Sequence, residues 1–330
     1  MSFPRYRKKL DVHVHCIPDF YAEALNEAGH YHVDGFNIPS WSVESHLEFN
    51  DSAGIEKAIL SISSPGVYFG DVEKAAILSR KCNEYTAEIK RQHPTRFGFF
   101  ASVPLPDTER AIAEAEYALK YLNADGIVLM SSYDTVYLGD PSFAEFFDAL
   151  HRLNATVFVH PTSPCSTSSN VPGAPGKFHP LPYPNPFSEF FFDSTRTAFS
   201  LLMNDTFNRC SGMKMILTHA GCVLPPLIDR FQGFATGGFG NKDGHAMQPL
   251  QKTVFERVYF DLSGAVLPNQ LPGLLQIADP KKLYYGSDYP FTPAATAAMY
   301  AEKLEGTDVM TEELKRGALE GSAWKALTGK

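Results

Sequence analysis

Two histidines separated by a single valine end the first apolar run of the chain, in the stretch LDVHVHC. Successive side chains of a strand point to opposite faces, so His13 and His15 face the same way. Later apolar runs also end in polar residues: His160 in VFVH, His219 in ILTH and Asp288 in YYGSD. Imidazole nitrogens combined with one carboxylate are the donors that suit Zn²⁺ or a similar divalent cation.

None of these residues is a strong signal alone. A single histidine at a strand end is more often a hydrogen-bonded core residue, and a single aspartate can cap the next helix. Their joint occurrence at the ends of buried runs predicts a metal site formed by His13, His15, His160 and Asp288. His219 is then a spare histidine beside the metal, where it suits general acid–base work because its pKa lies near neutrality.

Eight short apolar runs rich in β-branched and aromatic residues recur along the chain and read as strands buried on both faces. Segments with helical spacing separate them, which predicts one (β/α)8 barrel domain over residues 1–330 with its site at the carboxyl ends of the strands. A doubly wound open sheet is the rival fold, but no GxGxxG follows the first strand. The predicted strands are Leu10–His15, Lys57–Ser61, Phe97–Val103, Gly126–Leu129, Thr156–His160, Lys214–Thr218, Val258–Asp261 and Leu283–Ser287.

The intervening helices are predicted from apolar spacing, capping residues and glycine or proline stops. Two stretches interrupt the alternation: a long insertion after the fifth strand, residues 161–190, is rich in Pro and Ser, and residues 233–248 are rich in Gly. Insertions of this length are usually functional lids or interface segments, although a plain surface insertion is the alternative. The predicted helices span residues 42–54, 71–94, 107–126, 141–154, 195–212 and 310–327.

Composition indicates an ordinary globular protein, with 44% hydrophobic and 20% charged residues and a net charge of −8. The only basic cluster is RYRKK near the start, so we expect neither a nucleic-acid nor a membrane partner. The five cysteines form no CxxC motif, which favours free thiols in a reducing compartment. With no signal-like or membrane-spanning apolar run, we expect a cytoplasmic protein.

The motifs DVHVH, VFVHP, LTHAG and GSDYPF, in this order, resemble those of the amidohydrolase superfamily. Within it they are similar to the aminocarboxymuconate-semialdehyde-decarboxylase-like group, and the segment that begins GFNIPSWSVESHLEF resembles fungal 6-methylsalicylate decarboxylases. The resemblance implies one metal, most often zinc and in some members manganese, with His219 just outside the ligands. It further implies that Arg230 reaches a neighbouring subunit's site to bind a substrate carboxylate, in a homodimer or a dimer of dimers. A helix-surface salt bridge is the equal alternative for Arg230.

The chain departs from the muconate-semialdehyde enzymes in one respect. Those enzymes carry an arginine in the helix before the second strand, whereas the segment ESHLEFNDSAG contains His46 and Glu48 and no arginine. A dicarboxylate would lose a charge partner, so a monocarboxylate such as a hydroxybenzoate is favoured. The carbamylated lysine of binuclear members is also missing from the fourth strand, GIVLM, and this predicts a single metal.

The predicted activity is non-oxidative decarboxylation of a salicylate-type acid. Asp288 is the first choice to protonate the carbon that bears the carboxylate, and His219 is the second. Phe191 and Phe291 are predicted to wall a planar substrate, with helix-core packing as the alternative. A metal-dependent hydrolase of a lactone or related ester or amide would use the same ligands, with Asp288 as base. A non-catalytic barrel that only binds a ligand predicts no stoichiometric metal.

Overall fold

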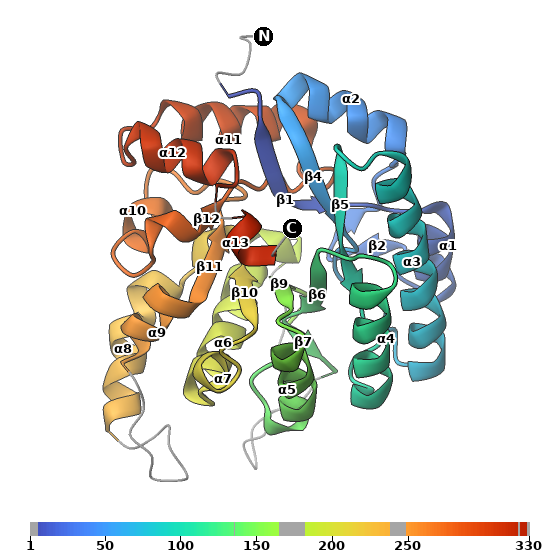
Figure 1. Ribbon diagram of the computed structural model, residues 1–330, viewed down its shortest axis with the longest axis horizontal. Helices are drawn as coiled ribbons and strands as arrows, with labels where there is room; N and C mark the ends of the chain where they lie inside the picture. The colour runs from blue at the N-terminus through green and yellow to red at the C-terminus, as the bar shows by residue number, and fades with distance from the viewer. Residues whose placement is uncertain (1–5, 135, 165–181, 238–248, 323, 329–330) are drawn as a thin grey trace.

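A closed ring of eight parallel strands forms the centre of the molecule in the computed structural model (Figure 1), which describes residues 6–134, 136–164, 182–237, 249–322 and 324–328. The strands pair in the order β1-β4-β5-β6-β9-β10-β11-β12. The ring closes where Asp11 pairs with Tyr285 and the Val12 amide donates to the Tyr285 carbonyl at 3.0 Å. The (β/α)8 barrel prediction is therefore confirmed. The strands are β1 Lys9–His15, β4 Ile55–Ser61, β5 Phe97–Ser102, β6 Gly126–Met130, β9 Thr156–His160, β10 Lys214–Leu217, β11 Val258–Asp261 and β12 Leu283–Tyr284.

Helices surround this ring on the outside (Figure 1). The predicted caps are present: Ser42 forms a capping box with Ser45, and Gly54 ends the same helix with a φ of +69°. Asp71 and Asp107 likewise accept hydrogen bonds from the first backbone amides of their helices. The helices are α1 Asp19–Glu27, α2 Val43–Ala53, α3 Val72–Gln92, α4 Thr108–Lys120, α5 Ala144–Arg152, α6 Glu189–Met203, α7 Thr206–Arg209, α8 Leu224–Thr236, α9 Leu250–Arg257, α10 Gln270–Leu274, α11 Ala294–Gly306, α12 Glu312–Leu319 and α13 Trp324–Thr328.

Several boundaries differ from the sequence prediction. The helix predicted over residues 195–212 starts six residues earlier and breaks at Asp205, which adopts a φ of +53°. The last predicted helix breaks at Gly321, where an added Cβ would lie 2.3 Å from a methyl carbon of Leu10. The eighth strand loses regular pairing after Tyr284 because the chain turns toward the site.

Two short hairpins were not predicted. β2 (His32–Val33) pairs with β3 (Phe36–Asn37), and β7 (Ser132–Tyr133) pairs with β8 (Val136–Tyr137). Of the Gly-rich stretch, residues 233–236 extend α8, and residues 238–248 lie outside the described part. Of the Pro/Ser-rich insertion, residues 165–181 also lie outside it, while its end begins α6.

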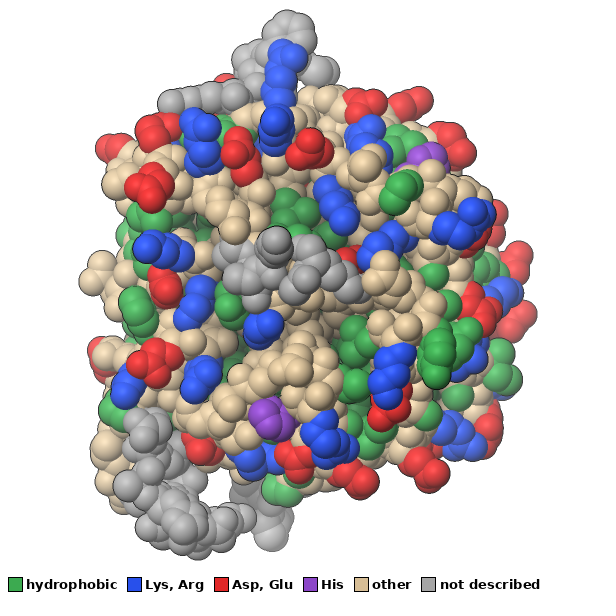
Figure 2. Space-filling model, in the orientation of Figure 1, with side chains coloured by type: hydrophobic (Ala, Val, Ile, Leu, Met, Phe, Trp, Pro, Cys, Tyr) green, Lys and Arg blue, Asp and Glu red, His purple; other side chains and the backbone are tan. Residues whose placement is uncertain are grey.

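The two ends of the barrel differ. At the amino ends of the strands, α13 lies across the opening, where Thr156 Oγ1 donates to the Leu327 carbonyl at 3.0 Å. Figure 2 shows acidic and basic side chains mixed over this face, without a block of one sign. Within the described residues, no helix is both long and apolar enough to span a membrane. The opposite end, where the strands terminate, carries the polar cluster.

Candidate metal centre

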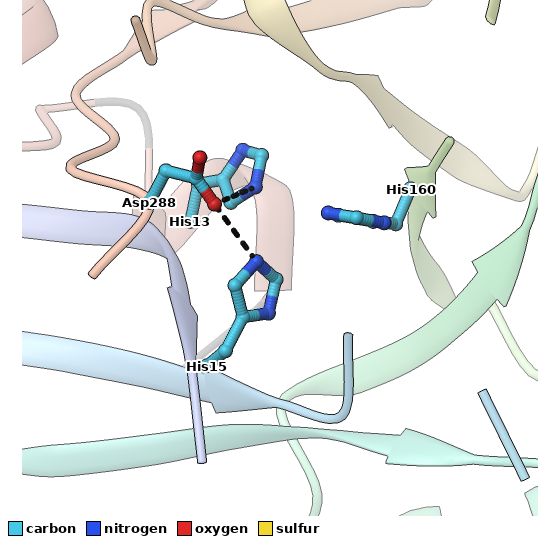
Figure 3. A group of neighbouring side chains, drawn as sticks. All are labelled: His13, His15, His160 and Asp288. Carbon is cyan, nitrogen blue, oxygen red and sulfur yellow. Dashed lines mark hydrogen bonds and ion pairs between the residues drawn. The ribbon is translucent and has the colours of Figure 1, made fainter. Parts of the chain in front are cut away.

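The four predicted ligands converge at the carboxyl ends of the strands. Each offers one nitrogen or oxygen, and these four atoms all lie within 4.8 Å of one another. Asp288 Oδ1 is 3.2 Å from His15 Nε2 and 3.5 Å from His13 Nε2, and Figure 3 shows His160 pointing toward this group from the opposite side. The three imidazoles are buried. Residues 275 positions apart are thus gathered because parallel strands of one barrel end at the same rim.

Hydrogen bonds fix which nitrogen of each histidine faces the centre. The Ser61 hydroxyl donates to the Val14 carbonyl at 3.0 Å, so its oxygen is left to accept from His15 Nδ1 at 3.1 Å. His160 Nδ1 lies 2.6 Å from the Pro161 carbonyl, which can only accept, and His13 Nδ1 lies 2.9 Å from Asp261 Oδ2. Each Nδ1 therefore carries a proton, and each Nε2 faces inward, the orientation in which histidines bind a metal.

The environment favours a bound cation. His13 Nε2 is buried without a hydrogen-bond partner in the described structure. Burial lowers the pKa of His15 and the pKa of His160, which keeps both imidazoles neutral and able to bind a metal. Burial alone would lower the pKa of His13 too, but the charge of Asp261 and its hydrogen bond raise that pKa to about 10.

The two carboxylates beside His13 are ionised. Burial raises the pKa of Asp288, but its interactions with the His13 and His15 rings outweigh burial and hold that pKa well below its ordinary value. The same balance, dominated on the lowering side by the charge of His13, lowers the pKa of Asp261. Two negative charges, one of them fully buried, lie against three imidazoles, and a divalent cation would balance them. The donor set therefore fits a metal ion.

The backbone around the cluster is tightly packed. Asp11 Oδ1 accepts from the amides of His13 and Ser287, both at 3.1 Å, and so ties β1 to the chain that follows β12. A Cβ added at Gly286 would lie 2.7 Å from the His13 Cβ, so only glycine fits there. Asp288 itself has a φ of +61°, a left-handed conformation that non-glycine residues seldom adopt.

His219 lies beside the four ligands. Its ring centre is 4.9 Å from that of His13, and burial lowers its pKa. Its backbone amide donates to Asp261 Oδ1 at 2.9 Å, and its φ is +51°. The neutral ring borders the cavity above the cluster, where it can reach a bound molecule.

A cavity of about 380 Å³ opens above the cluster, large enough for one small aromatic molecule. Aromatic rings make up much of its wall, and no lysine or arginine is among the described residues that border it. The lining residues are Val33, Asp34, Phe36, Ser63, His160, Pro186, Phe187, Phe190, Phe191, His219, Gly264, Ala265, Asp288, Phe291, Thr292, Pro293, Thr296 and Tyr300.

Both predicted aromatic residues border this cavity. Phe191 stacks on His219 with ring centres 5.8 Å apart and planes 20° from parallel, and Phe291 meets His15 edge to face at 5.7 Å. Phe190 approaches His160 at 6.0 Å, whereas Phe192, the next residue of α6 after Phe191, is 47% exposed and lies outside the cavity wall.

The predicted arginine does not reach the cavity of its own chain. Arg230 is exposed on α8, with its guanidinium carbon 5.1 Å from the centre of the Phe234 ring. The expected arginine of the muconate-semialdehyde enzymes is absent from helix α2. His46 of this helix is buried against Phe97 and Tyr289 and accepts a hydrogen bond from Trp41 Nε1 at 2.9 Å. His46 therefore contributes to packing rather than to the cavity wall.

Sequence reasoning missed the β2–β3 hairpin, which brings Asp34 and Phe36 to the cavity. The Asp-Gly pair at residues 34–35 was the available signal, because this dipeptide favours a tight hairpin turn. It also missed Ser61 as the partner of His15, although strand register places these two residues side by side.

The chain belongs to the amidohydrolase family, whose model matches residues 10–327. It is 36% identical over 329 residues to decarboxylase yanB of Aspergillus niger, covering 96% of this chain and 86% of the relative. It is 34% identical over 323 residues to the 6-methylsalicylic acid decarboxylase acuB of Aspergillus aculeatus, covering 94% and 95%. The predicted resemblance is confirmed.

Solved structures share the fold. A crystal structure of an amidohydrolase II superimposes with a TM-score of 0.88 at 32% identity, covering 97% of this chain and 99% of the other. A dihydroxybenzoic acid decarboxylase from Polaromonas sp. JS666, crystallised with manganese and an inhibitor, has a TM-score of 0.73 at 21% identity, covering 98% and 97%.

Proposed function

We propose that this protein is a metal-dependent, non-oxidative decarboxylase of a salicylate-type carboxylic acid, with residues 1–330 acting as one domain. The observation that carries the proposal is a His₃Asp cluster at the base of an aromatic-walled cavity. A cavity without a described lysine or arginine suits a substrate with one carboxylate and an otherwise uncharged ring. The relatives named as decarboxylases, one of them a 6-methylsalicylic acid decarboxylase, support the same activity.

His13, His15, His160 and Asp288 would hold one divalent cation. The three imidazole donors favour Zn²⁺, with Mn²⁺ as the alternative. When bound, the cation would supply Lewis-acid chemistry, stabilising the substrate's negative charge and withdrawing electrons from its ring. Phe191 and Phe291 confine the ring and keep water from the reacting carbon.

Asp288 is the proposed proton carrier. Because it is ionised before substrate binds, it can accept the proton of the substrate's ortho hydroxyl and deliver it to the carbon that bears the carboxylate. The bond from that carbon to the carboxylate then breaks, CO₂ leaves, and the electron pair restores the aromatic ring. A solvent proton neutralises the phenolate. Thr292 Oγ1 donates to Asp288 Oδ2 at 3.0 Å and orients the carboxylate, while His219 is the alternative donor.

A lactone or ester hydrolase is the second candidate, because the ionised state of Asp288 also suits that reaction. A carboxylate with a low pKa is suited to remove a proton from an attacking water. The same four ligands would serve both reactions, so only the substrate distinguishes them.

The test compares substrates on zinc- or manganese-loaded protein. We expect 6-methylsalicylate to yield equal amounts of CO₂ and 3-methylphenol, and dihydrocoumarin to release no acid in a pH-stat. Acid release from the lactone without CO₂ from salicylates would overturn the decarboxylase and support the hydrolase.

We further propose that the protein works in the cytoplasm as a homodimer or a dimer of dimers, with Arg230 of one subunit serving the other subunit's site. The exposed position of Arg230 leaves it available for such a contact. Mixing an inactive Asp288→Asn variant with an inactive Arg230→Ala variant should regenerate activity, since hybrid dimers contain one site with both residues. No regained activity in proven hybrids would contradict the shared site.

A further inference from the structure

One carboxylate contacts both a proposed metal ligand and the spare histidine. Asp261 ends β11, and its side chain is 0% exposed. Its Oδ2 accepts from His13 Nδ1 at 2.9 Å. Its Oδ1 accepts from the backbone amides of His219 at 2.9 Å and Ser263 at 3.0 Å. Both carboxylate oxygens are therefore hydrogen-bonded, and the carboxylate lies next to the proposed metal centre.

Asp261 has no strongly basic side chain beside it in the described structure. Its only ion-pair partner among the described residues is the His13 ring, so no lysine or arginine neutralises it there. A buried carboxylate without a cationic side chain is costly to fold, and it persists where a fixed charge is needed. The Asp261 carboxylate meets His13 at Nδ1, whereas Nε2 of the same ring faces the ligand cluster.

The backbone that Asp261 holds is strained. His219, Ala220 and Cys222 all have positive φ values between 51° and 56°, so the chain after β10 needs external support. Asp261 accepts from the first amide of this run. Gln270 Nε2 supports its carbonyls, donating to those of His219 and, at 3.2 Å, Cys222. Together these bonds determine where the His219 ring lies in the cavity wall.

We propose that Asp261 is a positioning residue that sets two groups at once: it aims His13 Nε2 into the metal centre and fixes the backbone from which His219 reaches the cavity. The inference rests on the proposed metal centre. The carboxylate keeps the proton of His13 on Nδ1 and strengthens Nε2 as a donor. A loss of Asp261 consequently weakens metal binding and displaces His219, although Asp261 contacts neither metal nor substrate.

The test measures metal affinity, which needs no knowledge of the substrate. Asp261→Asn keeps the size of the side chain and removes its charge. Competition with a chromophoric chelator should show Zn²⁺ bound about 10–100-fold more weakly than by the wild type. The matched control is Asp125→Asn, which removes another buried carboxylate, one that pairs with Lys90 at 2.8 Å and lies before β6 at the other end of the barrel. The control should bind Zn²⁺ with wild-type affinity.

A second measurement uses the wild-type protein, in case Asp261→Asn fails to fold. In protein labelled with ¹⁵N-histidine and loaded with Zn²⁺, we expect His13 to show a protonated Nδ1 whose hydrogen exchanges slowly with solvent. A wild-type affinity in folded Asp261→Asn, or an unprotonated His13 Nδ1 in the loaded protein, would overturn the positioning role. If the wild type binds Zn²⁺ but releases no CO₂ from salicylates, the proposed function fails while the role of Asp261 stands.

Discussion

Charged side chains are buried at both ends of this barrel, but they are paired differently. At the amino ends of the strands, the fully buried Lys9 ammonium meets Glu305 at 2.6 Å, the Ala53 carbonyl at 2.8 Å and the Tyr6 carbonyl at 3.0 Å. All three of its protons are used. At the carboxyl ends, His13 Nε2 makes no hydrogen bond in the described structure, and imidazoles are the only ion-pair partners described there for two carboxylates. The Lys9 charge is paired by groups of the protein itself, whereas a cation would complete the cluster at the second end. This difference separates an end that stabilises the fold from an end that performs chemistry.

Asp288→Asn gives the largest expected effect, because it removes both the charge of a proposed metal ligand and the proposed proton carrier. We expect kcat for decarboxylation to fall by about 10²–10⁴-fold at saturating metal, with the far-UV circular dichroism spectrum unchanged. Asp51→Asn, at an exposed carboxylate that pairs with Arg96 at 2.6 Å, is the control and should retain full activity. A kcat within tenfold of the wild type would exclude Asp288 as proton carrier.

Lys9→Ala tests the opposite end. Removing the ammonium breaks a buried ion pair with Glu305, so the free energy of unfolding in urea should fall by about 3–5 kcal/mol. Activity per folded molecule should not change, because Lys9 is remote from the cavity. The double variant Lys9→Met/Glu305→Leu removes both charges and should recover most of the lost stability. A loss of activity in folded Lys9→Ala protein would contradict the separation of the two ends.

His46 is a buried titratable residue that belongs to neither end of the barrel. Burial lowers its pKa from an ordinary value of 6.5 to about 3, so between these pH values the unfolded chain binds one more proton at this site than the folded chain. The stability from neutral His46 is complete above pH 6.5 and is lost as the pH falls toward 3. In metal-free protein, His46→Gln should reduce the pH slope of the unfolding free energy between pH 4 and 6 by about 1.4 kcal/mol per unit. An unchanged slope would show that His46 is already protonated in the folded state.

Phe191→Leu gives the smallest expected effect and defines the extent of the functional end. Losing the ring that stacks on His219 should lower kcat/KM by about fivefold, close to 1 kcal/mol. Phe192→Leu, at the next and largely exposed position of α6, is the matched control and should match the wild type. Equal losses in both variants would indicate a general effect on α6 instead of a contact with the substrate.

The sequence was sufficient to predict the strands and the four side chains that converge at their ends, for a common physical reason. Strands buried on both faces read as continuous apolar runs, so a polar residue at the end of such a run stands out. Because all parallel strands of a barrel end at the same rim, the residues at positions 13, 15, 160 and 288 could be assigned to one rim. Ser42, Asp71 and Asp107 identified helix starts because capping depends on local chemistry.

The rest depended on contacts between distant segments. The hydrogen bonds of Ser61 and Asp261 to the ligand histidines depend on strand register and side-chain direction, which no local sequence pattern encodes. Helix α1 has only two buried residues, Tyr21 and Leu25, and so lacks a clear apolar stripe. The two-residue strands of the β2–β3 hairpin are too short to show alternation.

The metal content of purified protein, measured by elemental analysis after gel filtration, tests the central claim most directly. The account predicts one divalent ion per wild-type chain, and no retained ion when His15 and His160 are both replaced by Ala, in protein that remains folded. A metal-free wild type with full decarboxylase activity, or a double variant that retains one ion per chain, would contradict it.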